Sequence, residues 1–339
     1  MRQIRIYGLK VTVIICVLLL MAGCTNIADD TAKTKVEPEE QKEPVKLALK
    51  FTPEDSTTYK VTTEADKSVE WQGPPPSKPS AFKGGHTGNK IETTFTQQIQ
   101  STDDKGNAVA KITIKGLVYL SKVRGNIILD FDSSREKDPN SPLSKLIGQS
   151  YTIELTSSGQ VSKVIDANDA RNNVKDSSSV GMAAVKLLSD DMIKERHSIP
   201  AMPDSDKDQL STGDRWSSIK SFSFDMMGSK SYEKVYTLNE IKKVDNHWVA
   251  IVRMNAIPSA EEAKELYKEE AADLFSQMFD NTETYTGELK LDLTVGKIEQ
   301  CREELMTEWV IVDPNPKDEK DPAALRMTAT RVYSIEKID

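Results

Sequence analysis

Apolar and polar residues alternate along most of the chain after residue 45, which is the period of a half-buried β-strand. The pattern is clearest in a predicted hairpin whose strands, 91–100 and 108–120, flank the polar turn 103–107. One face of the second strand carries only apolar residues, namely Ala110, Ile112, Ile114, Val118 and Leu120. Alternation and β-prone composition predict further strands at 47–51, 57–71, 126–131, 151–156, 160–165, 248–256 and 325–335. Residues 297–312 fit helical and strand periodicity alike, and the turn at Gly296 and the β-prone end favour a strand. The sequence therefore predicts a mostly antiparallel sheet.

Two polar segments interrupt this pattern. Residues 73–88 contain three consecutive prolines and several glycines, and proline cannot donate to a strand ladder. Residues 313–321 are dominated by charged residues and prolines. We expect both segments to be exposed loops.

Helical spacing of apolar residues occurs in two longer segments. The first runs from about 178 to 195. The second follows a capping box formed by Ser259 and Glu262 and continues to about 278. Each segment is apolar on one side only, so we expect both helices to pack on the sheet. The expected fold class is α+β: a curled, half-barrel-like antiparallel sheet with two longer helices.

The same order of elements is predicted twice. Asp55 before the strand at 57–71 corresponds to Asp214 before Trp216, and the hairpin at 95–112 corresponds to that at 236–252. A second hairpin in each half turns at Gly159-Gln160-Val161 and at Gly296-Lys297-Ile298. Three matches in one order predict an internal duplication, with pseudo-repeats at 46–199 and 212–339 that share one sheet and one core.

The first 24 residues have a different pattern. Three basic residues precede an apolar run at 11–22, which is followed by Gly23 and Cys24. The run is about a dozen residues long, whereas a membrane-spanning helix needs roughly twenty. A basic start, a short apolar centre and small residues before a cysteine therefore predict an export signal at 1–23.

Met21-Ala22-Gly23-Cys24 resembles the lipobox of bacterial lipoproteins, with Met21 where leucine is most common. The resemblance implies cleavage between Gly23 and Cys24 and lipidation of Cys24 with diacylglycerol and a palmitate-type chain. The protein would then face the extracytoplasmic side of the cell membrane or outer membrane. Because an acyl chain contributes about 0.8 kcal/mol per buried CH₂, two or three chains give a stable anchor. The alternative is an ordinary signal peptide with an incidental cysteine.

Composition separates a tether from the body of the protein. Residues 24–45 are mostly polar and charged and predict a flexible tether, which leaves a single β-rich domain at 46–339. Removing a signal with three basic and no acidic residues changes the net charge from −8 to −11. We therefore expect no nucleic-acid partner, because nucleic-acid binding requires clustered cations.

The sequence indicates no catalytic, cofactor or metal site. After cleavage and lipidation only Cys301 remains as a thiol, and a buried position in a strand is the preferred interpretation over a nucleophile. The histidines, His86, His197 and His247, belong to no metal-binding or catalytic motif. Three alternate aspartates at 204–208 lack the later residues of a calcium loop. Carboxylate pairs such as Asp130 and Asp132 are common in acidic proteins and give only a weak glycosidase hypothesis.

The layout resembles a family of uncharacterised β-rich envelope lipoproteins. The resemblance rests on the lipobox, Gly213-Asp214-Arg215-Trp216 and the turn at Gly159. The resemblance implies no activity. Two hypotheses follow: a non-catalytic binding or scaffolding module whose loops 73–88 and 313–321 contact an envelope protein, or a carrier of a lipid or other apolar ligand. The carrier hypothesis draws on a looser similarity to the half-barrels of lipoprotein carriers and mycobacterial lipid-binding lipoproteins. A core filled by Ile112, Val252 and Leu274 favours the module, whereas a lined hollow favours the carrier.

Overall fold

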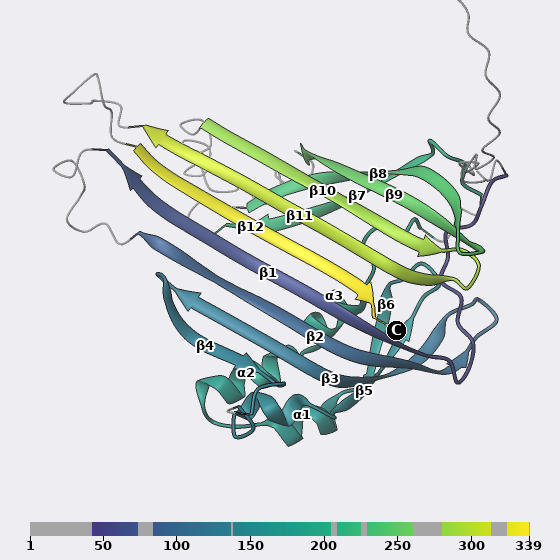
Figure 1. The fold of residues 1–339 in the computed structure, drawn as a ribbon, viewed down its shortest axis with the longest axis horizontal. Coiled ribbons are helices and arrows are strands. Elements are labelled where there is room, and N and C mark those ends of the chain that lie inside the picture. The colour runs from purple at the N-terminus through teal and green to yellow at the C-terminus, as the bar shows by residue number, and fades with distance from the viewer. Residues whose placement is uncertain are drawn as a thin grey trace, which may run out of the picture. The chain divides into compact units, whose positions relative to one another are not determined.

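The computed structural model describes residues 43–73, 84–136, 138–204, 209–224, 229–259, 280–312 and 324–338. Within these residues, twelve strands form one antiparallel sheet (Figure 1). They are β1 (Ser56–Gln72), β2 (Gly85–Thr102), β3 (Ala108–Val123), β4 (Asn126–Asp132), β5 (Ser150–Leu155), β6 (Val161–Asp166), β7 (Arg215–Ser223), β8 (Ser229–Val244), β9 (His247–Ser259), β10 (Asp280–Asp292), β11 (Lys297–Val312) and β12 (Ala324–Lys337). The predicted mostly antiparallel, curled sheet is confirmed.

The order of strands places the first and the last strand side by side in the middle of the sheet. It runs β6-β5-β3-β2-β1-β12-β11-β10-β9-β8-β7, and β4 pairs with the free part of β3. β1 pairs with β12 from Tyr59 opposite Lys337 to Gln72 opposite Ala324. This long ladder joins the five strands β1–β3, β5 and β6 to the five strands β7–β11.

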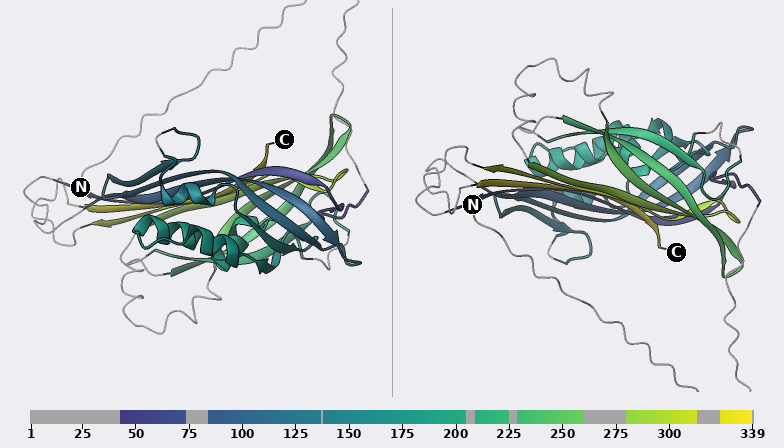
Figure 2. Two further views of the ribbon diagram at one scale, coloured as in Figure 1. Left: turned by 90° about the horizontal axis from the view of Figure 1, so that it is seen from below. Right: turned by 90° about the horizontal axis from the view of Figure 1, so that it is seen from above.

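Three helices lie on the concave face of the sheet (Figure 2): α1 (Asn168–Val174), α2 (Ser179–Leu187) and α3 (Asp190–His197). The prediction of one helix from 178 to 195 is therefore wrong. The hydroxyl of Ser189 accepts a hydrogen bond from the Met192 N–H and caps a new helix, so the chain turns after Leu187. Sequence reasoning missed α1, which is short and polar. Of the predicted helix at 259–278, Ser259 ends β9 and the rest lies outside the described residues.

Alternating residues of the strands point into one hydrophobic core, to which the helices also contribute. Ile112, Ile153, Leu238 and Leu289 are completely buried, and Val252 is nearly so. The predicted face of β3 changes partway, because Lys115 forms a bulge where the register with β2 shifts between Thr94 and Phe95. Leu117 is therefore buried, and Val118 and Leu120 do not share the face of Ile112 as predicted.

The segment before β1 is anchored to the body rather than forming the predicted strand at 47–51. Val45, which was expected to end the tether, exchanges backbone hydrogen bonds of 2.8 Å with Leu210 and is buried, as is Leu47. Lys50 donates its N–H to the carbonyl of Gly296 at 3.0 Å. Apolar side chains thus fix the end of the tether on the core.

The start of β2 replaces part of the predicted loop at 73–88. Gly85 to Gly88 pair with Val69 to Asp66 of β1, whereas 74–83 lie outside the described residues. A Cβ at Gly88 would come within 1.7 Å of Oδ1 of Asp66. The glycine thus leaves room for the Asp66 carboxylate, which lies 2.6 Å from Nε2 of His86.

Candidate functional site

The predicted lipidation and cleavage residues, Cys24 and Gly23, lie outside the described residues, as do the loop 313–321 and Leu274. Cys301 lies on β11 and is completely buried. Burial, followed by the nearby Glu303 carboxylate, raises the pKa of its thiol far above the usual value. A buried thiol held in its protonated form is a poor nucleophile, so Cys301 acts as a core residue in the folded protein.

The three histidines lie in three separate environments. His86 lies beside Asp66 on the sheet, and Nδ1 of His247 lies 2.6 Å from Asp292, whose other oxygen accepts the backbone N–H groups of a turn. His197 is buried at the end of α3. Within the described part of the chain, no group of histidine, cysteine or carboxylate side chains could hold a metal ion.

A buried polar cluster, which sequence reasoning did not find, lies on the concave face around Glu303 of β11. We name it the Glu303 cluster. Nζ of Lys234 lies 3.2 Å from both carboxylate oxygens. The hydroxyls of Tyr236 and Tyr285 each donate to one of these oxygens at 2.8 Å. All four side chains are almost fully buried.

The register of the sheet assembles the Glu303 cluster. One row of paired residues crosses four strands from Glu303 through Gly287 and Met254 to Tyr236. A Cβ at Gly287 would come within 3.1 Å of Cγ of Glu303, so only glycine leaves space for the carboxylate to reach across. The signal in the sequence is the alternation of Tyr232, Lys234, Tyr236 and Leu238 along β8.

Burial governs the electrostatics of the Glu303 cluster. It raises the pKa of Tyr236 and of Tyr285, and the charge of Glu303 raises both further. Burial lowers the pKa of Lys234, while Glu303 opposes that change. The tyrosines are therefore neutral donors at neutral pH. Because Lys234, Tyr236 and Tyr285 all bond to Glu303, the cluster links β8, β10 and β11 across the concave face.

A second buried cluster, the Arg196 cluster, lies where α2 and α3 meet the sheet. Arg196 donates to the hydroxyl of Tyr151 at 3.1 Å and to the carbonyl of Leu187 at 2.7 Å. The Tyr151 oxygen lies 2.7 Å from Nε2 of His197. Nδ1 of His197 is buried and has no hydrogen-bond partner among the described residues. Burial, and then Arg196, lowers the pKa of His197 well below its usual value.

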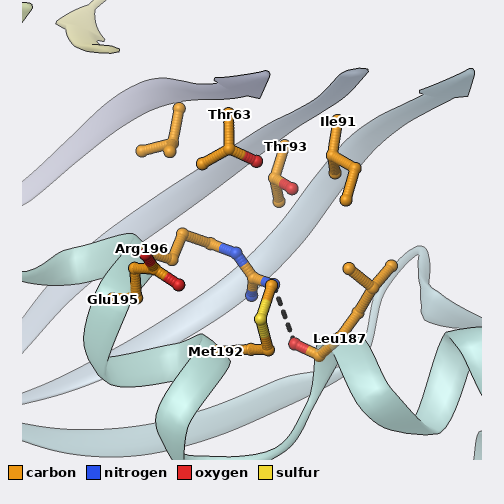
Figure 3. A pocket seen from close by; sticks show the side chains of 8 residues that line it. Thr63, Ile91, Thr93, Leu187, Met192, Glu195 and Arg196 are labelled. Carbon is orange, nitrogen blue, oxygen red and sulfur yellow. Dashed lines mark hydrogen bonds between the residues drawn. The ribbon is translucent and has the colours of Figure 1, made fainter. Parts of the chain in front are cut away.

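Three small cavities adjoin the Arg196 cluster. One of about 10 Å³ is lined by Arg196, Thr63 and Thr93 among others (Figure 3), and another of about 10 Å³ is also lined by Arg196 and Thr93. The third, of about 30 Å³, reaches His197 beneath the segment at Leu49–Phe51. Pockets for drug-sized molecules have volumes of roughly 300–1,000 Å³. These cavities are thus of a size for single water molecules or ions.

A comparison with models of protein families finds a match. Residues 105–298 match the model of DUF6263, described as a family of unknown function, and this match covers more than half of the 339 residues. The chain belongs to the DUF6263 family. The match runs from the β2–β3 turn to the start of β11, so it includes Arg196 and Lys234 but not Glu303. The family description assigns no activity.

No match was found among curated proteins. Among solved structures, the chain is similar to one titled "Lipid-protein interactions in lipovitellin", with 9% identity and a TM-score of 0.37 over 86% of this chain and 26% of that chain. It thus spans about a quarter of the length of that chain. It is also similar to OpdQ of Pseudomonas aeruginosa, with 6% identity and a TM-score of 0.18 over 83% of this chain and 98% of that chain. Both TM-scores lie below 0.5, so neither likeness bears on function.

Proposed function

We propose that this protein is a bacterial lipoprotein, anchored to an envelope membrane through lipidated Cys24, and that its β-rich body is a non-catalytic binding or scaffolding module. The observation that carries the proposal is the basic, apolar and lipobox-like order of residues 1–24. Among the described helices none has the length and apolar character needed to cross a bilayer. In the proposal the acyl chains, rather than a helix, hold the body at the membrane.

The small size of the three cavities described above supports a module over a carrier. Ile112 and Val252, two residues expected to fill the core, are buried in it, and these cavities hold about 10–30 Å³ each. An acyl chain or other apolar ligand needs a cavity at least ten times larger. Lys234, Tyr236 and Tyr285 of the Glu303 cluster all bond to Glu303, which agrees with a structural role for these side chains.

Lipidation is tested with Cys24→Ala and the matched variant Cys16→Ala, which changes a cysteine inside the predicted signal. We expect the wild type and Cys16→Ala to incorporate a labelled fatty acid and to sediment with membranes after the signal is removed. We expect Cys24→Ala to incorporate no label. A labelled Cys24→Ala protein, or an unlabelled wild type that is exported, would refute the anchor.

Native mass spectrometry of the unlipidated mature protein distinguishes the module from the carrier. A module should give only the mass of the polypeptide. A co-purifying mass of a few hundred daltons that detergent displaces would refute the module and favour the carrier.

We also propose that the body arose by internal duplication. In support, β1–β3, β5 and β6 follow the same spatial order as β7–β11. Before β1, Glu54 and Asp55 bond to Ile99 through backbone hydrogen bonds of 2.9 Å; before β7, Gly213 and Asp214 bond in the same way to Leu238 at 2.7 and 3.0 Å. Ile99 and Leu238 each precede a register shift in their hairpin. Superposition of experimental coordinates of the two halves is the test, and halves that align only when strands are taken out of order would refute it.

A further inference from the structure

Arg196 is a buried guanidinium without a carboxylate partner in the described part of the chain. Only 5% of the residue is exposed, and its hydrogen bonds go to the neutral Tyr151 hydroxyl and Leu187 carbonyl. Glu195 lines the same cavity, but its carboxylate faces Lys220 of β7 at 4.0 Å. Buried charges are normally paired, because an isolated ion loses its hydration without compensation.

The helix ends compensate Arg196 only in part. Leu187 is the last residue of α2, so the guanidinium bonds to the negative end of that helix. A helix terminus carries roughly half an elementary charge, whereas the guanidinium carries a full one. The remaining partner of Arg196, Tyr151, supplies no charge because burial raises the pKa of its hydroxyl.

Further hydrogen-bond donors face the cavity beside Arg196. Thr63 of β1 and Thr93 of β2 project from the sheet towards Arg196 (Figure 3). Neither threonine hydroxyl has a hydrogen-bond partner among the described residues, although Thr93 is only 3% exposed. Arg196 has five N–H groups, of which the two bonds above use two. The cavity thus combines a positive charge with several donors that lack acceptors.

From this arrangement we propose that the space between Arg196 and the threonines of β1 and β2 binds a small monovalent anion of the size of chloride. The two cavities lined by Arg196 share Thr93 and Leu187 and hold about 10 Å³ each. This space accommodates roughly one water-sized sphere, which excludes a phosphate or an acyl carboxylate with its chain. Met192 also lines the first cavity, and its flexible side chain provides the adjustment that an ion slightly larger than water requires.

The anion would fasten the helices to the sheet. It would lie between Arg196 of α3 and hydroxyls of β1 and β2, so its binding would stabilise the folded state in proportion to its concentration. This site goes beyond the proposed anchoring and scaffolding role and does not depend on it, because none of its residues belongs to the predicted anchor or loops.

The test compares the thermal unfolding of the full chain in chloride, in bromide and in gluconate, which is too large for the cavity. At about 150 mM salt, we expect chloride and bromide to raise the midpoint by roughly 2 °C or more relative to gluconate. The variant Thr63→Val/Thr93→Val removes both hydroxyls, keeps β-branched side chains in the strands and should lose most of this shift. The control Thr62→Val/Thr94→Val changes the neighbouring threonines of the opposite face and should retain it.

An equal response to all three salts in the wild type, or equal shifts in both double variants, would overturn the site. A crystal grown in bromide gives an independent readout that does not depend on stability. Anomalous density within hydrogen-bond distance of Arg196 and Thr93 supports the anion, whereas density with no anomalous signal identifies a water and refutes it.

Discussion

Replacing Glu303 with glutamine tests whether the Glu303 cluster stabilises the curled sheet. In the wild type the carboxylate accepts hydrogen bonds from two tyrosines and lies 3.2 Å from Nζ of Lys234, whose side chain is 4% exposed. The amide keeps the space filled and retains one carbonyl oxygen as an acceptor. It leaves Lys234 without a counter-charge in the interior. Breaking a buried ion pair by removing one partner costs about 3–5 kcal/mol, and we expect the lower end, about 3 kcal/mol.

This loss is a large part of the stability of a domain, which is about 5–15 kcal/mol. Urea unfolding followed by tryptophan fluorescence measures it, because Trp216 stacks on Tyr236 at a ring distance of 5.8 Å. With a slope of about 3 kcal/mol per molar urea, the midpoint should fall by roughly 1 M. The control Glu304→Gln changes the next residue, whose pairing with Arg302 is largely exposed, and should alter the midpoint little.

The double variant Lys234→Met/Glu303→Gln separates the charge from the packing. It removes both charges, and replacing a buried pair by uncharged residues is often close to neutral. We therefore expect it to be more stable than Glu303→Gln alone. If Glu303→Gln and Glu304→Gln unfold at the same urea concentration, the cluster does not stabilise the fold and the reasoning fails.

Three further predictions concern other parts of the body. The pKa of His197 is depressed in the folded state, so its contribution to stability is present in full above the unfolded pKa of about 6.5. Below that pKa the free energy of unfolding falls by about 1.4 kcal/mol per pH unit. Between pH 7 and pH 5, urea unfolding should therefore show a smaller loss of stability for His197→Gln than for the wild type, and equal losses would contradict this. At alkaline pH the free energy of unfolding should fall as pH rises above about 10, because tyrosines with a raised folded pKa keep protons that the unfolded chain releases. Lys234 acts in the opposite sense, against six such tyrosines: Tyr119, Tyr151, Tyr232, Tyr236, Tyr285 and Tyr333. A tyrosine titration that is complete before the protein unfolds would exclude this. Gly296→Ala should destabilise the fold more than Gly125→Ala. Both glycines have a positive φ, but only a Cβ at residue 296 would come within 2.4 Å of Lys50. Equal urea midpoints would show that the segment before β1 moves aside without cost.

Local patterns predicted the strands well where one face is buried. Helical and strand periodicity were both compatible with 297–312, and the turn at Gly296 together with the β-prone end correctly indicated β11. The pattern failed where a bulge at Lys115 moved Leu117 into the core, because a bulge leaves no apolar signature of its own. It also failed at Ser189, where a capping side chain divided one apolar stripe into α2 and α3.

The buried polar clusters could not be predicted from local sequence. Lys234 and Glu303 are charged residues in strands, and such positions normally face solvent. Their pairing depends on a register that spans four strands and on the space above Gly287. Arg196 and His197 likewise meet Tyr151 only because α3 folds back over β5. Pairing between distant strands, rather than the residues themselves, creates these environments.

The ladder between β1 and β12 also constrains when the protein can fold. Its partners lie about 250 or more positions apart in the sequence, so it contributes strongly to a high contact order, which slows folding. The first five strands cannot join the last five until the C-terminal strand has been synthesised and is free to pair. Such a chain remains incompletely folded for most of its synthesis. If the protein is exported as we propose, this delay would keep the polypeptide in a form that can be threaded through a membrane before it acquires its final structure.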